Sequence, residues 1–350
     1  MISGFKHIDH PIFLVHEHLI YFFGNLFEKE AELNTKELFH NDFLPVLEAS
    51  NKLTTQFENL QKEYLQLCLA DKYEIKHAFS LNNCTLSLSD LSIKPIKYDD
   101  LTNKVFAKTL KDFFLDFWKD YPHVNQLEND YGTVGDHYEK LITSNDIYVC
   151  PFCGLMSFEP PAGKYREEYD HYLAEALYPF ISFNFHFLFP TCGKCNKNEK
   201  RADDVLYKND TRREVYYPYD HAIRPDDLEI IIEPINTIKG HSTLLSNIDW
   251  NLKIKRNGIE DDKIIAWDDI YKIKRRYQEH IVRREKIWFE TIFTSYKREI
   301  KKGVSYSDFK DEFLENLKFK ILKDSHSIIE YSFAKYQFAN PNFKSFLESQ

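Results

Sequence analysis

The chain has 350 residues, of which 43% are hydrophobic and 16% aromatic, with 13 Pro and 10 Gly. This length and composition exclude an intrinsically disordered chain and a single small module, and they favour two or three compact units with a sizeable core. The formal net charge of −9 does not by itself indicate a protein that binds nucleic acid.

The N-terminal region, residues 1–145, is predicted to be mainly helical. Apolar residues recur three and four positions apart in Leu44–Tyr73 and in Asn103–Lys119, as the buried side of a helix requires. Asp136–Ser144 reads as a shorter helix that leads into the next region.

An apolar run near the start, Pro11–Phe27, is interrupted by His16, Glu17 and His18. The polar residues favour a buried helix over a membrane span. His16 and His18 are two positions apart and face different sides of a helix, which favours a structural role over metal binding. We expect no secretory leader and no membrane association, and therefore a cytoplasmic protein.

Charge is distributed unevenly along the chain. Residues 1–149 hold 14 Lys, no Arg and 23 acidic residues, and the first of 11 arginines is Arg166. Residues 253–302 hold 15 basic and 9 acidic residues. Because guanidinium groups make bidentate contacts with phosphates, we expect any nucleic-acid contact in the C-terminal two-thirds. The alternative is that Lys272–Lys286 is only the solvated face of a long helix.

Four of the six cysteines form two Cys-x-x-Cys pairs separated by 38 residues: Cys150, Cys153, Cys192 and Cys195. Four thiolates close a tetrahedral zinc site and leave no coordination position open for catalysis. We therefore predict a structural zinc ion. Cys68 and Cys84 are expected to be ordinary buried thiols, a pattern typical of a reducing compartment.

Short extended segments replace the helical pattern around these cysteines. Ile147–Val149, Tyr165–Tyr172 and Phe180–Phe189 are predicted strands, with a turn near Tyr178. A helix should follow from Cys192. Asn196 and Lys200 lie four residues apart and would share one face of that helix.

The C-terminal region, residues 206–350, is predicted to be mainly helical after two extended segments, Tyr216–Tyr219 and Leu228–Pro234. A long basic helix is expected over Asp268–Lys302, followed by two or three more helices through Phe346. His280 and Trp288 on the long helix are expected to pack in the interior.

Two cysteine pairs around a strand–turn–strand–helix, with Asp-His on the first strand, resemble the zinc-stabilised HNH branch of the His-Me finger endonucleases. The resemblance covers about residues 148–203, and the matching residues are Cys150, Cys153, Asp170, His171, Leu188, Pro190, Cys192, Cys195, Asn196 and Lys200. It implies an α+β, mainly α chain in which a zinc-stabilised ββα HNH module, residues 146–205, lies between the two helical regions.

The resemblance also implies a catalytic role for three residues. Asp170 and Asn196 would hold a divalent ion, Mg²⁺ or Mn²⁺, which polarises the scissile phosphate. His171 would be the general base that takes a proton from the attacking water. Contacts with nucleic acid are expected from four basic residues, Lys200, Arg201, Arg275 and Arg276.

Two positions depart from the family pattern. Phe187 stands where the family has a central asparagine, nine residues before Asn196, and Ala174 stands where a proline follows the catalytic histidine. The central asparagine braces the loop that aims the histidine. Asn184 and His186 are the nearest substitutes and, on a strand, would share one face while Phe187 points to the other.

The expected function is a metal-dependent endonuclease acting on DNA, as an effector of a prokaryotic anti-phage defence system with a protein partner such as an ATPase. The defence role is an analogy with other HNH proteins that carry large flanks. One alternative is a catalytically degenerate HNH domain that binds nucleic acid or acts as a scaffold. Another is a zinc ribbon that binds nucleic acid without nuclease ancestry.

Overall fold

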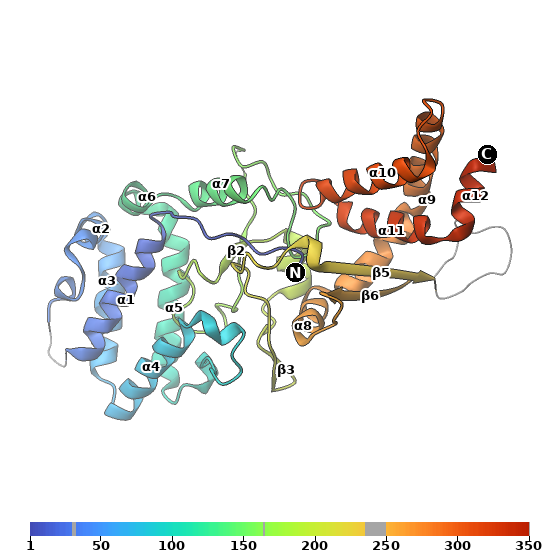
Figure 1. The fold of residues 1–350 in the computed structure, drawn as a ribbon. Helices are drawn as coiled ribbons and strands as arrows, with labels where there is room; N and C mark the ends of the chain where they lie inside the picture. The colour runs from blue at the N-terminus through green and yellow to red at the C-terminus, as the bar shows by residue number, and fades with distance from the viewer. Residues whose placement is uncertain (30–32, 164, 235–249, 350) are drawn as a thin grey trace.

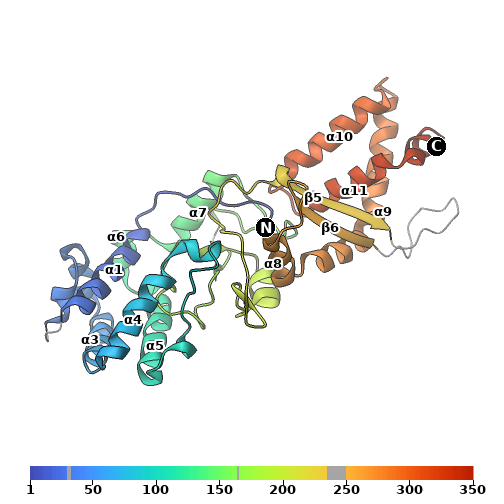
Figure 2. The same cartoon turned by 60° about the horizontal axis from the view of Figure 1, so that its bottom comes forward.

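The computed structural model describes residues 1–29, 33–163, 165–234 and 250–349, and shows a mainly helical α+β chain (Figure 1). The molecule is elongated, with the N-terminal helices at one end and the C-terminal helices at the other (Figures 1 and 2), and Figure 1 shows β2 and β3 between them. The sheets are three two-stranded antiparallel pairs in the described part of the chain.

The described part of the N-terminal region forms seven α-helices: α1 (Phe13–Glu28), α2 (Leu44–Ala49), α3 (Asn51–Leu65), α4 (Leu69–Asn82), α5 (Lys104–Asp120), α6 (Asn125–Tyr131) and α7 (Val134–Asn145). The predicted helix over Leu44–Tyr73 is wrong as a single element, because the chain forms three helices there. Ser50 ends α2 in an extended conformation, and its side chain accepts the Leu53 N–H as the N-cap of α3.

A cluster of aromatic side chains joins these helices to the middle of the chain. Phe180 is buried with ring centroids 5.1 Å from both Phe23 and Phe79 and 5.7 Å from Phe114. Its φ of 72° lies in the left-handed region, which is costly for a bulky residue. Burial of the ring among α1, α4 and α5 offsets that cost and ties the middle region to the N-terminal helices.

The middle region is built on a short hairpin. Strand β1 (Tyr169–His171) pairs with β2 (Leu188–Pro190), so that Asp170 lies opposite Phe189. A single π-helical segment, Lys194–Lys200, follows directly. The hairpin is shorter than predicted: only the last two residues of the expected second strand belong to β2, and Ile147–Val149 contributes only one isolated bridge.

The described part of the C-terminal region begins with two antiparallel strand pairs, β3 (Tyr207–Lys208) with β4 (Thr211–Arg212), and β5 (Leu228–Pro234) with β6 (Trp250–Arg256). Strand β5 confirms the extended segment predicted there, whereas Tyr216–Tyr219 forms no strand. The helices are α8 (Asp262–Tyr271), α9 (Ile273–Ile300), α10 (Tyr306–Lys320), α11 (Ser327–Ala339) and α12 (Pro341–Ser349).

The predicted helix Asp268–Lys302 is divided in two. Lys272 adopts a left-handed conformation, with φ of 53°, and separates α8 from α9. Trp288 lies in the interior, as predicted. The prediction that Cys68 and Cys84 are buried thiols is wrong, because Cys68 is exposed and Cys84 is half-buried. Among the described residues, no helix combines the length and apolar character needed to cross a membrane.

Candidate functional site

The four cysteines of the two Cys-x-x-Cys pairs form one buried cluster, in which all Sγ atoms lie within 4.8 Å of one another. Cys150 and Cys195 are 3.9 Å apart at Sγ, and Cys153 and Cys192 are 3.8 Å apart. A tetrahedral zinc ion with bonds of about 2.3 Å spaces its sulfur ligands about 3.8 Å apart. The cluster therefore has the composition and size of a structural zinc site.

The first cysteine pair lies in a tight loop, residues 150–154, which we call the first knuckle. The N–H groups of Cys153 and Gly154 both bond to the Cys150 carbonyl, at 3.2 and 2.7 Å. Gly154 has a φ of 65°, and a Cβ there would lie 2.7 Å from Ile2 and 2.8 Å from Ile328. Glycine is required at this position by both conformation and space.

The first knuckle also binds distant parts of the chain. Its four consecutive carbonyls, from residue 151 to residue 154, each accept one hydrogen bond of 2.8 or 2.9 Å. The donors are, in order, the backbone N–H of Ile2, the indole of Trp267, the hydroxyl of Tyr277 and the backbone N–H of His326. The cysteine cluster is therefore the point at which the N-terminal segment, α8, α9 and the start of α11 meet.

Arg276 belongs to this cluster and not to the surface. It is 3% exposed, and its guanidinium donates to Cys195 Sγ at 3.2 Å and to the Tyr271 carbonyl at 3.3 Å. Although burial opposes it, the cysteine sulfurs raise the pKa of this guanidinium further above its ordinary value. The expectation that Arg276 contacts nucleic acid is corrected accordingly, because its guanidinium does not face solvent.

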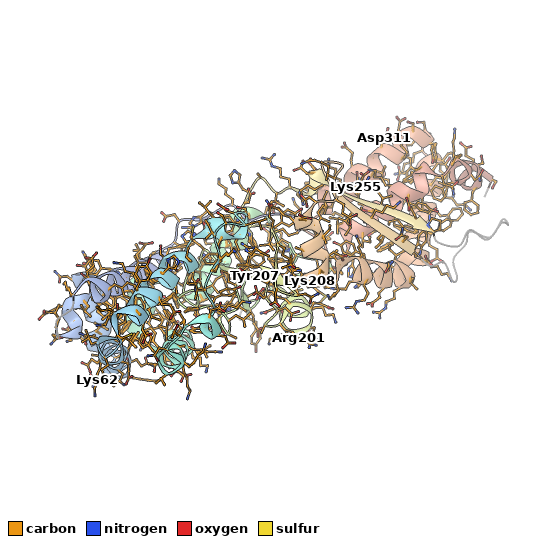
Figure 3. The ribbon with its side chains drawn as sticks, turned by 90° about the horizontal axis from the view of Figure 1, so that it is seen from below. Lys62, Arg201, Tyr207, Lys208, Lys255 and Asp311 are labelled. Carbon is orange, nitrogen blue, oxygen red and sulfur yellow. The ribbon has the colours of Figure 1, made fainter. Side chains whose placement is uncertain are left out.

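A cavity of about 430 Å³ adjoins the hairpin and the π-helical segment. Asp170 and His171 of β1 line it together with Asn196 and Lys200 of the π-helical segment. Arg201 lines it as well and is exposed, as Figure 3 shows at the edge of the middle region. The residues that the sequence singled out as catalytic are thus brought to one cavity.

The Asp170 carboxyl is buried, and only one of its two oxygens accepts a hydrogen bond. Its Oδ1 accepts a hydrogen bond of 2.8 Å from the Lys200 ammonium, whereas its buried Oδ2 has no partner among the described residues. Burial raises the pKa of this carboxyl, and Lys200 opposes the shift. An unpaired buried carboxylate oxygen is uncommon in folded proteins and is available to a water molecule or an ion.

His171 is held at one nitrogen. Its Nε2 donates a hydrogen bond of 2.9 Å to the Ser182 carbonyl and lies 3.3 Å from Glu175 Oε2, which has no hydrogen-bond partner among the described residues. The Nε2 atom therefore carries the proton, and Nδ1 keeps its lone pair. Burial lowers the pKa of His171 to about 4, and the bond to Ser182 opposes this shift.

The loop that carries His171 is braced by backbone atoms and not by a side-chain amide. Phe187, at the position of the family's asparagine, accepts the Tyr172 N–H through its carbonyl at 2.9 Å while its ring is buried. Asn184 bonds instead to Asn83 and to the His186 N–H. The expected substitution by Asn184 or His186 is therefore wrong, because Ser182 contacts the histidine.

Sequence reasoning missed three residues around His171. Trp118 of α5 lies edge-on to His171, with ring centroids 5.1 Å apart, and Glu175 follows His171 by four residues. The only indication of Glu175 in the sequence is its position four residues after His171. Trp118 and the Ser182 carbonyl depend on tertiary contacts that no local pattern reveals.

The remaining predicted contact, Arg275, is exposed on α9, where it pairs with Glu199 at 3.0 Å and with Glu279 at 3.5 Å. Glu199 belongs to the π-helical segment, so Arg275 joins α9 to the element that carries Asn196.

Comparisons of the chain with protein-family models, with curated proteins and with solved structures found no match.

Proposed function

We propose that the protein is a metal-dependent endonuclease of the HNH type. The observation that carries the proposal is the meeting of Asp170, His171 and Asn196 at one cavity, on a hairpin followed by a short helix, beside a buried cluster of four cysteines. The resemblance in sequence supplied the roles, and the shared cavity supports them.

The residues present fit a hard divalent ion. The unpaired Oδ2 of Asp170 and the amide of Asn196 are oxygen donors of the kind that Mg²⁺ and Mn²⁺ prefer. Such an ion, when bound, would polarise the scissile phosphate and stabilise the leaving 3′ oxygen. The thiolates beside it are soft ligands and would retain zinc.

His171 would act as the general base through Nδ1. The Ser182 carbonyl fixes the proton on Nε2, so the free lone pair is on the other nitrogen. The depressed pKa keeps the imidazole neutral at physiological pH, with its lone pair free, and also makes it a weaker base than a histidine whose pKa is near neutrality. Glu175 would stabilise the imidazolium that forms.

Nucleic acid would approach the exposed side of the cavity. Arg166 and Arg201 line that cavity, and Arg275 lies on the adjoining helix α9. DNA is the substrate that we expect, and the protein partner and the role in defence remain proposals by analogy. Lys200 is 1% exposed in its pair with Asp170, so the expectation that it contacts nucleic acid is corrected as for Arg276.

One observation favours the degenerate-domain alternative. Asp170 is already paired with Lys200 and both side chains are nearly inaccessible, as in a purely structural ion pair. A scaffold of this kind would keep the cysteine cluster and the cavity but would not cut DNA.

Incubation of the zinc-loaded protein with supercoiled plasmid tests the proposal. Mg²⁺ or Mn²⁺ should produce nicked or linear DNA with 5′-phosphate and 3′-hydroxyl ends, and EDTA added just before the substrate should prevent it. Binding of plasmid without cleavage under either metal would support the scaffold instead.

A further inference from the structure

The ammonium of Lys200 lies inside the protein at the candidate metal site. The side chain is 1% exposed, and Nζ is 2.8 Å from Asp170 Oδ1 and 2.8 Å from the His171 carbonyl. Few lysines are buried to this extent, because removing an ammonium from water is costly. The position of this charge, against the carboxylate assigned to the metal, requires an explanation.

The winding of the π-helical segment places Lys200 there. The Arg201 N–H bonds to the Asn196 carbonyl at 2.7 Å, a five-residue step that is typical of π-helical turns and of functional sites. Asn196 and Lys200 then line the same cavity from one short element. One short element therefore carries both the cation and the proposed amide ligand, whereas Asp170 lies on β1.

We propose that Lys200 is an internal cation that neutralises Asp170 before metal arrives and competes with the divalent ion for that carboxylate. The inference rests on the proposed function in one respect, because it takes Asp170 as the metal ligand. It adds a regulatory property: the affinity of the site for the divalent ion is low while no substrate is bound.

The competition follows from the charges. A divalent ion on Asp170 would lie close to an ammonium in a site of low dielectric, where repulsion between cations is strong. Either Lys200 leaves Oδ1 or the ion binds more weakly. A nucleic-acid phosphate supplies the negative charge that both cations need, so metal and substrate should each strengthen the binding of the other.

The unpaired Oδ2 distinguishes this arrangement from a structural ion pair. A pair that serves only stability is expected to satisfy both carboxylate oxygens, since an unpaired buried oxygen costs free energy. Here the Lys200 ammonium donates hydrogen bonds to Asp170 Oδ1 and to the His171 carbonyl, while Asp170 Oδ2 has no partner among the described residues. One ligand position is thus kept free next to the cation.

Binding of Mn²⁺ to the zinc-loaded full chain, measured by electron paramagnetic resonance without nucleic acid, tests the inference. Lys200→Met should bind Mn²⁺ at least about tenfold more tightly than the unaltered chain, because the competing charge is gone. Lys197→Met is the matched control: it removes an exposed lysine three residues away, paired with Glu168, and should leave the affinity unchanged.

Two more variants keep the result interpretable. Lys200→Gln keeps an uncharged donor and should also bind more tightly, which covers the case in which Lys200→Met does not fold. The double variant Asp170→Asn, Lys200→Met should lose the added affinity. Unchanged Mn²⁺ affinity in a folded Lys200 variant would overturn the inference, and plasmid cleavage by the unaltered chain decides the proposed function separately.

Discussion

His171 shows how one hydrogen bond assigns a chemical role. Its Nε2 donates to the Ser182 carbonyl, with Glu175 Oε2 at 3.3 Å, so Nδ1 is left to accept a proton. Glu175, unlike the Ser182 carbonyl, can be replaced by mutation without altering the backbone. It is a positioning residue in this account, because it acts through His171.

Replacing Glu175 should therefore lower the rate without abolishing it. We expect Glu175→Ala to slow plasmid cleavage on the order of tenfold, compared with about 10²–10⁴-fold for loss of a general base. Glu175→Gln, which keeps an acceptor oxygen, should recover part of the rate while KM stays unchanged. A rise in KM with an unchanged kcat would instead assign Glu175 to substrate binding.

A second residue makes stability depend on pH. His16 is buried in α1, and burial, followed by the neighbouring His186, lowers its pKa to about 3. The unfolded chain binds the proton at its ordinary pKa near 6.5, so the stabilising contribution is present above that pH. It is lost as pH falls from about 6.5 toward 3.

Urea unfolding at pH 7.5, 6 and 5 measures this effect. The free energy of unfolding should fall with pH, and His16→Gln should make the fall shallower. His77→Gln, at an exposed position of α4, is the control and should keep the slope of the unaltered chain. Identical slopes for His16→Gln and the unaltered chain would count against this assignment.

At the scale of elements, the first knuckle organises the middle of the molecule. Four neighbouring carbonyls bind donors from four distant segments, and two of these donors are side chains of α8 and α9. The knuckle is thus held by the elements around it as well as by its cysteines. Removing one donor leaves a buried carbonyl unpaired.

Tyr277→Phe isolates that contribution. The variant keeps the buried ring and loses the hydroxyl that bonds to the Cys153 carbonyl at 2.9 Å. We expect the free energy of unfolding to fall by about 1–3 kcal/mol. Tyr148→Phe, which removes an exposed hydroxyl, should change it little, and equal effects of the two substitutions would refute the role given to the knuckle carbonyls.

The elements also show what the sequence could and could not predict. Helix α5 and strand β5 follow their periodic patterns, because each buries one face. Only the end of the aromatic run from Phe180 forms the predicted strand, as part of β2, and the Phe180 ring packs among helices α1, α4 and α5. Strand propensity depends on such context, and periodicity alone does not reveal it.

The sequence also predicted part of the candidate site. Cysteine spacing located the four-sulfur cluster, and the Asp-His pair between the knuckles located the cavity. Arg276 was assigned to the surface because its neighbours are basic. A basic run does not show which side of the helix faces inward, and this guanidinium lies against Cys195.

At the scale of the whole molecule, the loop that carries Cys150 and Cys153 joins regions that are far apart in sequence. We expect one zinc ion per chain, and Cys150→Ser should lose it. Because α8 and α9 bond to the knuckle, removing zinc should also expose residues 262–300.

Hydrogen–deuterium exchange before and after chelation checks this coupling. Faster exchange should appear in residues 150–154 and in α8 and α9, while α3 and α5 of the N-terminal region keep their protection. Uniform protection after complete removal of zinc would show that the cluster does not hold these regions together.

The central claim is that His171 is the base of a nuclease, and plasmid cleavage at matched zinc content tests it most directly. His171→Ala should fold, retain zinc and lose about 10²–10⁴-fold in cleavage rate. His186→Ala, a nearby half-buried histidine whose ring stacks on His7, should cleave at close to the unaltered rate. Equal cleavage by the unaltered chain and His171→Ala, or no cleavage by either, would contradict the account.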